Sequence, residues 1–195
     1  MSVKLLFRTS PAQVRSLALV EGSRTSAVLA QILLAERHGV RPRLESLPIG
    51  ASATESAADA VLMIGDRAMG PAPADFHDSW DLGAAWREWT GLPMVFAMWM
   101  ARPGLELAEI EPALDAARDR GVESLPQLAA TESRAMQLPY ELVYSYLSQN
   151  LHYHLGPNER RGLGEFFRRA AELEFIAPAQ PWQWDETTAD YRTVT

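Results

Sequence analysis

The sequence predicts an α/β fold, in which residues 1–100 form one α/β lobe and residues 101–195 form a helical segment. Two observations predict this arrangement. Strand and helix signals alternate along the first hundred residues, and after Arg102 every clear pattern before the tail is helical. Such an alternation followed by a run of helices is typical of an α/β unit joined to a helical part.

Short apolar runs predict the strands of the lobe. Val3–Phe7 lies almost at the start of the chain, and Ser16–Val20 (SLALV) and Ala60–Ile64 (AVLMI) read as buried strands. Residues 94–100 (MVFAMWM) are apolar throughout, which predicts a strand that is buried on both faces. Residues 42–47 carry a weaker strand signal.

Two helices are predicted within the lobe, over residues 23–38 and 82–89. The apolar face of the first is made of Val28, Leu29, Ile32 and Leu33. Gly39 ends it as a natural C-terminal residue, and Asp81 precedes the second helix, where a carboxylate suits the helix dipole. Residues 70–78 contain prolines and glycines that predict a loop.

The part of the chain after Arg102 predicts four helices. They cover residues 106–120, 125–135, 139–155 and 158–173. Their breaks fall at Gly121, at Leu138-Pro139 and at Gly156-Pro157, where glycine and proline interrupt the helical pattern.

Composition excludes several classes of protein. The 25 acidic and 18 basic residues give a net charge of −7, which argues against nucleic acid as a partner. The absence of cysteine excludes disulfides, thiolate metal sites and a cysteine nucleophile. The first residues, MSVKLLFRTS, do not resemble a signal peptide, and no apolar run is long enough to span a membrane. We therefore expect a cytoplasmic protein.

The segment EGSRTS, residues 21–26, carries the clearest chemical signal. It follows a predicted strand and opens a predicted helix, so free N–H groups and the positive end of the helix dipole meet there. The hydroxyls of Ser23, Thr25 and Ser26 and the guanidinium of Arg24 would add donors for a carboxylate or phosphate. The alternative is plain helix capping by Ser23 or Thr25, with Arg24 in solvent.

Gly65 and Asp66 stand at the end of the strand Ala60–Ile64. In open α/β sheets, ligands bind beyond the carboxyl ends of the strands, so Asp66 is a candidate to accept a hydrogen bond from a substrate hydroxyl. The alternative is an ordinary turn residue.

Other candidates favour structural roles. His152 and His154 are two positions apart, which on a helix directs them to different faces, so we predict no metal site. Trp80, Trp86, Trp89 and Trp99 are interpreted as core residues, with a wall for a ring-shaped substrate as the alternative. The motifs of serine hydrolases, NTPases, zinc proteases and Rossmann dehydrogenases are absent.

Three runs, in order, resemble the menaquinone-biosynthesis enzymes of the futalosine pathway, and most closely their chorismate dehydratase branch. The runs are SRTSAVLAQILLAERHGVRP (23–42), ADAVLMIGDRAM (58–69) and DLGAAWREWTGLPMVFAMW (81–99). YLSQNLHYHLG (146–156) and GLGEFF (162–167) are similar to the C-terminal helices of that branch. The resemblance extends from Ser2 to about Leu173.

This resemblance implies a periplasmic-binding-protein type II-like fold with the substrate between two lobes. It implies dehydration of chorismate to 3-[(1-carboxyvinyl)oxy]benzoate, without a metal or an organic cofactor. By the same resemblance, Ser23, Arg24, Thr25 and Ser26 would hold a substrate carboxylate, and Gly65 and Asp66 would line the cleft. Ser2 matches a family serine at the reacting centre and is assigned a catalytic role.

Family members carry a further N-terminal stretch with a motif like YLNALPL, to which nothing here corresponds. The resemblance thus implies one complete α/β lobe, residues 1–100, and C-terminal helices, residues 101–195, of an incomplete second lobe. If the chain is the whole polypeptide, we expect no dehydratase activity. The alternatives are the sister enzyme that forms 1,4-dihydroxy-6-naphthoate, a non-catalytic protein that binds small carboxylates, and an inactive truncated form.

Overall fold

The computed structural model describes residues 3–102 and 104–177. Its strands are β1 (Val3–Phe7), β2 (Ser16–Val20), β3 (Arg43–Leu47), β4 (Ala60–Ile64) and β5 (Asp78–Asp81). Its helices are α1 (Thr25–His38), α2 (Leu82–Thr90), α3 (Ile110–Glu123), α4 (Leu125–Ala135), α5 (Tyr140–Ser145) and α6 (Pro157–Glu172). Short 3₁₀ turns are η1 (Pro11–Gln13), η2 (Ala53–Glu55) and η3 (Gly65–Ala68), and η4 (Tyr146–Asn150) is a π-helical turn.

The chain divides into two compact units, which we call the α/β unit and the helical unit. Of the described residues, the α/β unit contains 3–96 and 156–177, and the helical unit contains 97–155 except residue 103. Helix α6 belongs to the α/β unit because Phe166 and Ala170 pack into its core beside α1. Contacts thus separate the chain at residues 96 and 156 rather than at 100, while the assignment of segments to two lobes stays a prediction.

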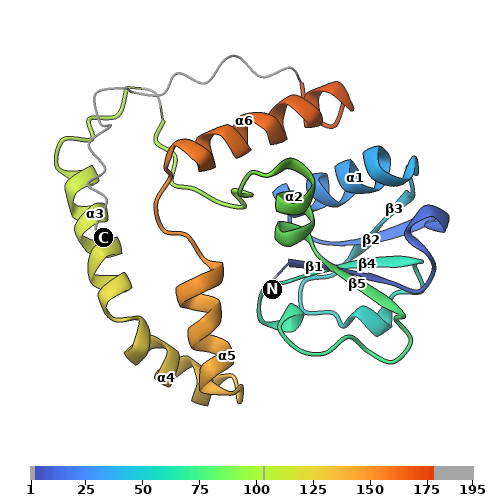
Figure 1. The fold of residues 1–195 in the computed structure, drawn as a ribbon, viewed down its shortest axis with the longest axis horizontal. Helices are drawn as coiled ribbons and strands as arrows, with labels where there is room; N and C mark the ends of the chain where they lie inside the picture. Colours follow the sequence, from blue (N-terminus) through green and yellow to red (C-terminus); the bar gives the residue numbers. More distant parts are fainter. Residues whose placement is uncertain (1–2, 103, 178–195) are drawn as a thin grey trace. The chain divides into compact units, whose positions relative to one another are not determined.

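The α/β unit is built on a mixed five-stranded sheet with the order β3-β2-β4-β1-β5 (Figure 1). Strand β2 pairs in parallel with β3 and β4, whereas β1 runs antiparallel to β4 and β5. The predicted strands Val3–Phe7, Ser16–Val20 and Ala60–Ile64 are confirmed with the expected bounds. Each is a short apolar run that is stabilised on both faces of the sheet.

The two faces of the sheet have separate apolar cores. Leu5, Phe7 and Leu62 point to the face that α1, α2 and α6 cover, whereas Leu6 and Met63 point to the other face. This division follows from the alternation of side chains along a strand. The second face is covered by the segments around η2 and η3, through residues such as Ala53, Ala68 and Phe76.

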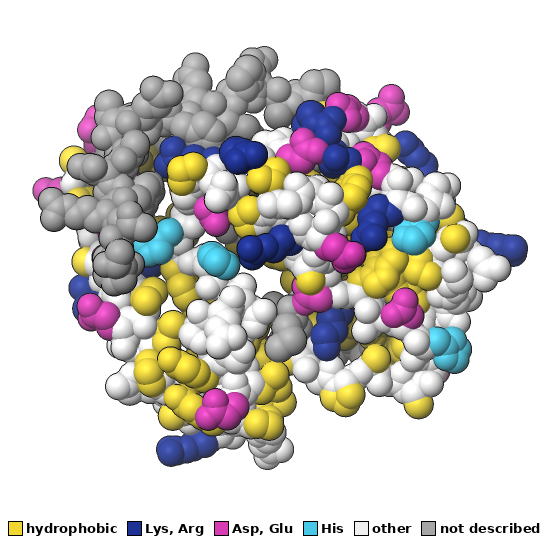
Figure 2. All heavy atoms as spheres, viewed as in Figure 1, with side chains coloured by type: hydrophobic (Ala, Val, Ile, Leu, Met, Phe, Trp, Pro, Cys, Tyr) yellow, Lys and Arg dark blue, Asp and Glu magenta, His cyan; other side chains and the backbone are white. Residues whose placement is uncertain are grey.

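Helix α6 is fixed to α1 and α2 by charge as well as by apolar contact. The guanidinium of Arg169 pairs with the Glu36 carboxylate of α1 and lies 3.9 Å from the centre of the Trp89 ring of α2. Arg169 also bonds Glu165 on its own helix, at 2.6 Å. Figure 2 shows basic and acidic side chains interspersed on the face in view.

The helical unit contains α3, α4 and α5 with the π-helical turn η4. Its buried residues are Leu125, Ala129, Ser133 and Val143. Its exposed apolar residues include Leu105, Ile110, Leu114, Val122 and Leu128. Among the described residues, no helix combines the length and the apolar character needed to cross a bilayer.

Two sequence predictions about strands are wrong. Residues 94–100 form no strand: Met94 and Phe96 pack on the core, but Trp99 and Met100 are exposed. This run is apolar, but apolar character alone does not make a strand: within the described chain the run pairs with none of the five strands. Strand β5 was not predicted: it lies between the loop expected over 70–78 and the helix expected over 82–89. Its sequence DSWD has no apolar pattern, and its conformation comes from pairing with β1.

The predicted helices differ mainly at their ends. Residues 125–135 match α4, whereas the helix expected over 106–120 begins at Ile110. The helix expected over 139–155 is shorter: α5 passes into η4, which ends at Asn150, and the chain then continues without regular structure to Gly156. His152 and His154 therefore lie outside any helix, and both are exposed.

Candidate anion-binding site

The candidate site lies at one edge of the sheet, where several chain segments converge. The parallel strands β2, β3 and β4 end there, and the antiparallel β1 begins there, with Val3 opposite Ile64. Strand topology therefore brings the EGSRTS turn (residues 21–26) and Gly65-Asp66 to the same edge. Ser2 precedes β1 but lies outside the described residues, so its catalytic role stays a prediction.

The EGSRTS turn is held by backbone hydrogen bonds. The N–H of Glu21 donates to the Leu47 carbonyl at 2.9 Å, and the N–H of Ser23 donates to the Val20 carbonyl at 3.2 Å. Gly22 adopts a left-handed backbone with φ of +82°, which glycine accepts without strain. The Glu21 carboxylate accepts a hydrogen bond from the Ser46 hydroxyl at 2.8 Å, so it is engaged with β3.

Helix α1 begins at Thr25, with Arg24 at the N-cap and no side-chain cap. Neither Ser23 nor Thr25 therefore performs the capping role that was the alternative interpretation of this turn. Within the part of the chain that the structure describes, the hydroxyls of Ser23, Thr25 and Ser26 and the guanidinium of Arg24 have no hydrogen-bond or ion-pair partner.

This arrangement has the chemistry of an anion site. The first N–H groups of an α-helix have no partner within the helix and carry the positive end of its dipole. Three hydroxyls and one guanidinium stand beside them: Ser26 is buried, Ser23 and Thr25 are half-buried, and Arg24 is exposed. A carboxylate placed here would receive charge-assisted hydrogen bonds, which are stronger than neutral ones.

Gly65 and Asp66 open the turn η3 directly after β4. Gly65 has φ of +66°, and the carbonyl of Asp66 accepts a hydrogen bond from the Met69 N–H at 3.0 Å. The Asp66 side chain is exposed and has no hydrogen-bond partner among the described residues. Asp66 thus serves the turn with its backbone and leaves its carboxylate available at the edge.

Sequence reasoning missed Ile49, an apolar residue at the same edge. Its side chain is 73 % exposed, and its Cδ1 lies 4.0 Å from the position that a Cβ on Gly22 would occupy. An exposed isoleucine beside hydrogen-bond donors offers apolar contact to the body of a ligand. Residues 49–59 had no clear pattern, so no signal in the sequence indicated this exposure.

The tryptophans divide between the two interpretations. Trp86 is fully buried and packs edge-on against Trp89 and Phe166, and Trp80 packs against Phe7 at 4.6 Å between ring centroids. Trp86 is a core residue, as predicted, and the partly buried Trp80 and Trp89 pack against the core. Trp99 is 65 % exposed, so its interpretation as a core residue is wrong.

No metal-binding group of three or more His, Asp or Glu side chains is found in the described ranges. The donors at the α1 N-terminus are N–H, hydroxyl and guanidinium groups, which bind anions rather than cations.

Comparison with known proteins identifies a family and a similar protein. The family model described as menaquinone biosynthesis matches residues 1–172. A protein of Thermus thermophilus named chorismate dehydratase is 34 % identical over 200 aligned residues, which cover 92 % of this chain and 71 % of the relative.

Proposed function

The chain belongs to the menaquinone biosynthesis family, and we propose that it dehydrates chorismate to 3-[(1-carboxyvinyl)oxy]benzoate. The similarity to a chorismate dehydratase over 71 % of that enzyme's length supports this reaction. The observation that carries the proposal is the uncapped N-terminus of α1, where Arg24 and three hydroxyls have no protein partner in the described chain.

The proposed fold is of the periplasmic-binding-protein type II kind, with the α/β unit as one lobe. A mixed sheet with an antiparallel strand β1 between β4 and β5 is compatible with it. In this arrangement the carboxyl edge of β2 and β4 would face the substrate. A cytoplasmic location stays a prediction.

Chorismate is a dicarboxylate, and we place one of its carboxylates at the N-terminus of α1. Arg24 would supply the charge, and Ser23, Thr25 and Ser26 would supply hydroxyl donors. Ile49 would contact the apolar part of the ring, and Asp66 would accept a hydrogen bond from a ring hydroxyl. These contacts would fix the ring in one orientation.

For this reaction the protein mainly has to orient the substrate. One C–H bond and one C–O bond of the ring break, a new ring double bond forms, and the proton and hydroxide leave together as water. Aromatisation favours the product, so the barrier concerns positioning and the transfer of one proton. The residues at the edge would hold the substrate while this elimination occurs, with Ser2 at the reacting centre as the resemblance implies.

The test is to measure chorismate turnover by the purified protein as its natural gene encodes it. Ultraviolet absorbance would follow the loss of chorismate, and chromatography would identify the product. We expect 3-[(1-carboxyvinyl)oxy]benzoate to appear in proportion to enzyme. Chorismate that binds and remains unchanged would instead indicate a carboxylate-binding protein, and turnover of only the cyclic futalosine derivative would indicate the sister enzyme.

A further inference from the structure

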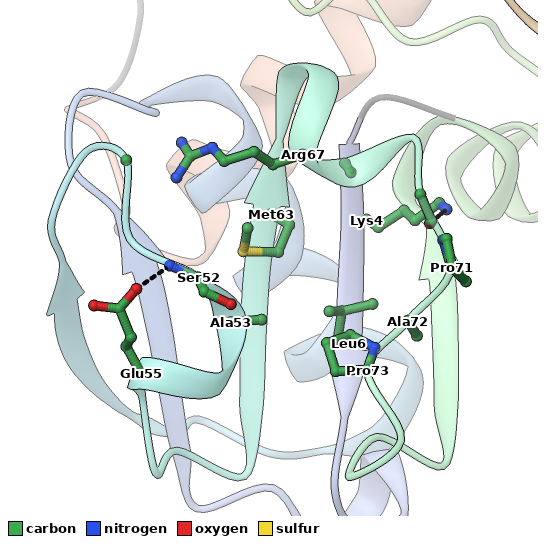
Figure 3. A pocket seen from close by; sticks show the side chains of 13 residues that line it. Lys4, Leu6, Ser52, Ala53, Glu55, Met63, Arg67, Pro71, Ala72 and Pro73 are labelled. Atoms are coloured by element: carbon green, nitrogen blue, oxygen red, sulfur yellow. Dashed lines mark hydrogen bonds between the residues drawn. The ribbon is translucent and has the colours of Figure 1, made fainter. Parts of the chain in front are cut away.

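A cavity lies on the face of the sheet opposite α1. Its volume is about 320 Å³, which is at the lower end of small-molecule sites, roughly 300 to 1,000 Å³. Its floor is formed by Leu6 of β1 and Met63 of β4, and the segments around η2 and η3 form its walls (Figure 3). All of its lining residues belong to the α/β unit.

This cavity is separate from the candidate anion site at α1. Leu6 and Met63 belong to the apolar core of the second face, whereas Leu5 and Leu62 belong to the core that α1 covers. Lys4 lies two residues before Leu6 on β1 and therefore points to the same face as the cavity.

Two cations line the cavity, and both keep donors free. The Lys4 ammonium donates one hydrogen bond, to the Gly70 carbonyl at 3.1 Å. The Arg67 guanidinium donates one, to the Ala51 carbonyl at 2.7 Å. Since an ammonium has three N–H donors and a guanidinium five, each retains N–H groups for a ligand.

One carboxylate, that of Glu55, lines the cavity, and it already accepts a hydrogen bond. It accepts a hydrogen bond from the Ser52 N–H at 2.6 Å in a capping box that closes η2. Figure 3 shows this carboxylate turned toward the Ser52 amide. Two cationic side chains and this one carboxylate give the lining a formal charge of +1, so it favours an anionic ligand.

The two cationic groups extend toward opposite ends of the cavity, with Leu6 and Met63 between them (Figure 3). Gly50 and Gly70 add no side chains to the walls, and Pro71 and Pro73 add rigid apolar surface. A ligand that fits this pattern has an acidic group at each end and a compact apolar body.

We propose that this cavity binds a small dicarboxylate, with one carboxylate at Lys4 and the other at Arg67. The apolar body of the ligand lies over Leu6 and Met63. The site is additional to the one proposed for chorismate, because it opens on the other face of the sheet and uses none of residues 21–26.

The test is calorimetric titration of the protein with isophthalate, a stable aromatic dicarboxylate. We expect saturable binding that Lys4→Met and Arg67→Gln each weaken by about tenfold or more, because each removes a charged hydrogen-bond donor. Benzoate, with one carboxylate, should bind about tenfold more weakly than isophthalate. Ala72→Trp, which fills the exposed wall of the cavity without changing charge, should abolish binding.

Because the α1 site would also attract a carboxylate, every titration is made in the Arg24→Ala background. The matched control is Arg87→Gln, which removes an exposed arginine of α2 that does not line the cavity and should leave isophthalate affinity unchanged. Melting temperatures should verify that every variant is folded. Three results would overturn the proposal: no saturable binding by the Arg24→Ala protein, an affinity left unchanged by Lys4→Met or by Arg67→Gln in a folded variant, or loss of binding in Arg87→Gln.

Discussion

Gly162 of α6 lies directly against the carbonyl oxygen of Pro93. A Cβ at Gly162 would come 2.1 Å from that oxygen, closer than any two such atoms can approach. The segment after α2 and helix α6 are therefore in backbone contact at this point, and only a residue without a side chain permits it.

We predict that Gly162→Ala destabilises the protein by about 1 to 3 kcal/mol, because the obstructing atom belongs to the backbone and cannot rotate away. The measurement is urea unfolding. Gly164→Ala on the same helix is the control: nothing lies within 4 Å of its added Cβ, so helix propensity should stabilise the protein by up to about 1 kcal/mol. Equal effects of the two substitutions would contradict the close contact.

Glu165 links the stability of α6 to pH. Hydrogen bonds from Arg168, and further from Arg169, lower the pKa of its carboxyl from 4.5 to about 2, against the opposing effect of burial. The folded state thus favours the carboxylate. The stability that this contributes is complete above the unfolded pKa and is lost as the pH falls from about 5 toward 2.

We predict that Glu165→Gln lowers stability at pH 7 by about 1 kcal/mol, a value reduced by solvent screening around the half-exposed Arg168. The variant should also lose less stability than wild type between pH 6 and pH 3, as measured by urea unfolding at each pH. Glu172→Gln is the control, because Glu172 is a more exposed partner of Arg168 and should contribute less. Parallel pH profiles for wild type and Glu165→Gln would show that Glu165 is not coupled in this way.

Substitution by alanine should destabilise the protein strongly at Trp86 and very little at Trp99. Trp86 is fully buried, so Trp86→Ala should cost about 3 to 5 kcal/mol, whereas Trp99 is 65 % exposed and Trp99→Ala should change stability by less than about 0.5 kcal/mol. Thermal unfolding would measure both. Trp86→Phe should cost much less than Trp86→Ala, because the buried indole N–H has no hydrogen-bond partner to lose among the described residues. A large loss in Trp99→Ala would contradict the exposure of that ring.

The sequence alone predicts those elements whose conformation follows from their own residues. Val3–Phe7, Ser16–Val20 and Ala60–Ile64 are short apolar runs with clear ends, and each forms a strand with the expected bounds. Residues 94–100 are also apolar but pair with no strand in the described chain, and the polar β5 becomes a strand because it pairs with β1. Strand pairing is a tertiary property, which composition alone does not reveal.

In the candidate site, too, some features could be predicted from local sequence and others depend on the tertiary structure. The residues of the EGSRTS turn were predicted from a strand followed by a helix start, and the topology of β2 and β4 brings them to one edge with Gly65 and Asp66. That Ser23 and Thr25 leave the helix uncapped was not predictable, because hydroxyl residues at these positions commonly cap. The exposure of Ile49 depends on how the segment after β3 folds over Gly22.

The most direct test of the account is chorismate affinity in wild type and Arg24→Ala, measured by calorimetry on the protein expressed from its native locus. Arg24 is exposed, and its side chain has no hydrogen bond or ion pair among the described residues, so its removal should leave the melting temperature unchanged. We predict that the variant binds chorismate more weakly by about 1.5 to 3 kcal/mol, the contribution of a charged hydrogen bond. Equal affinity in the two proteins would contradict a substrate carboxylate at the N-terminus of α1.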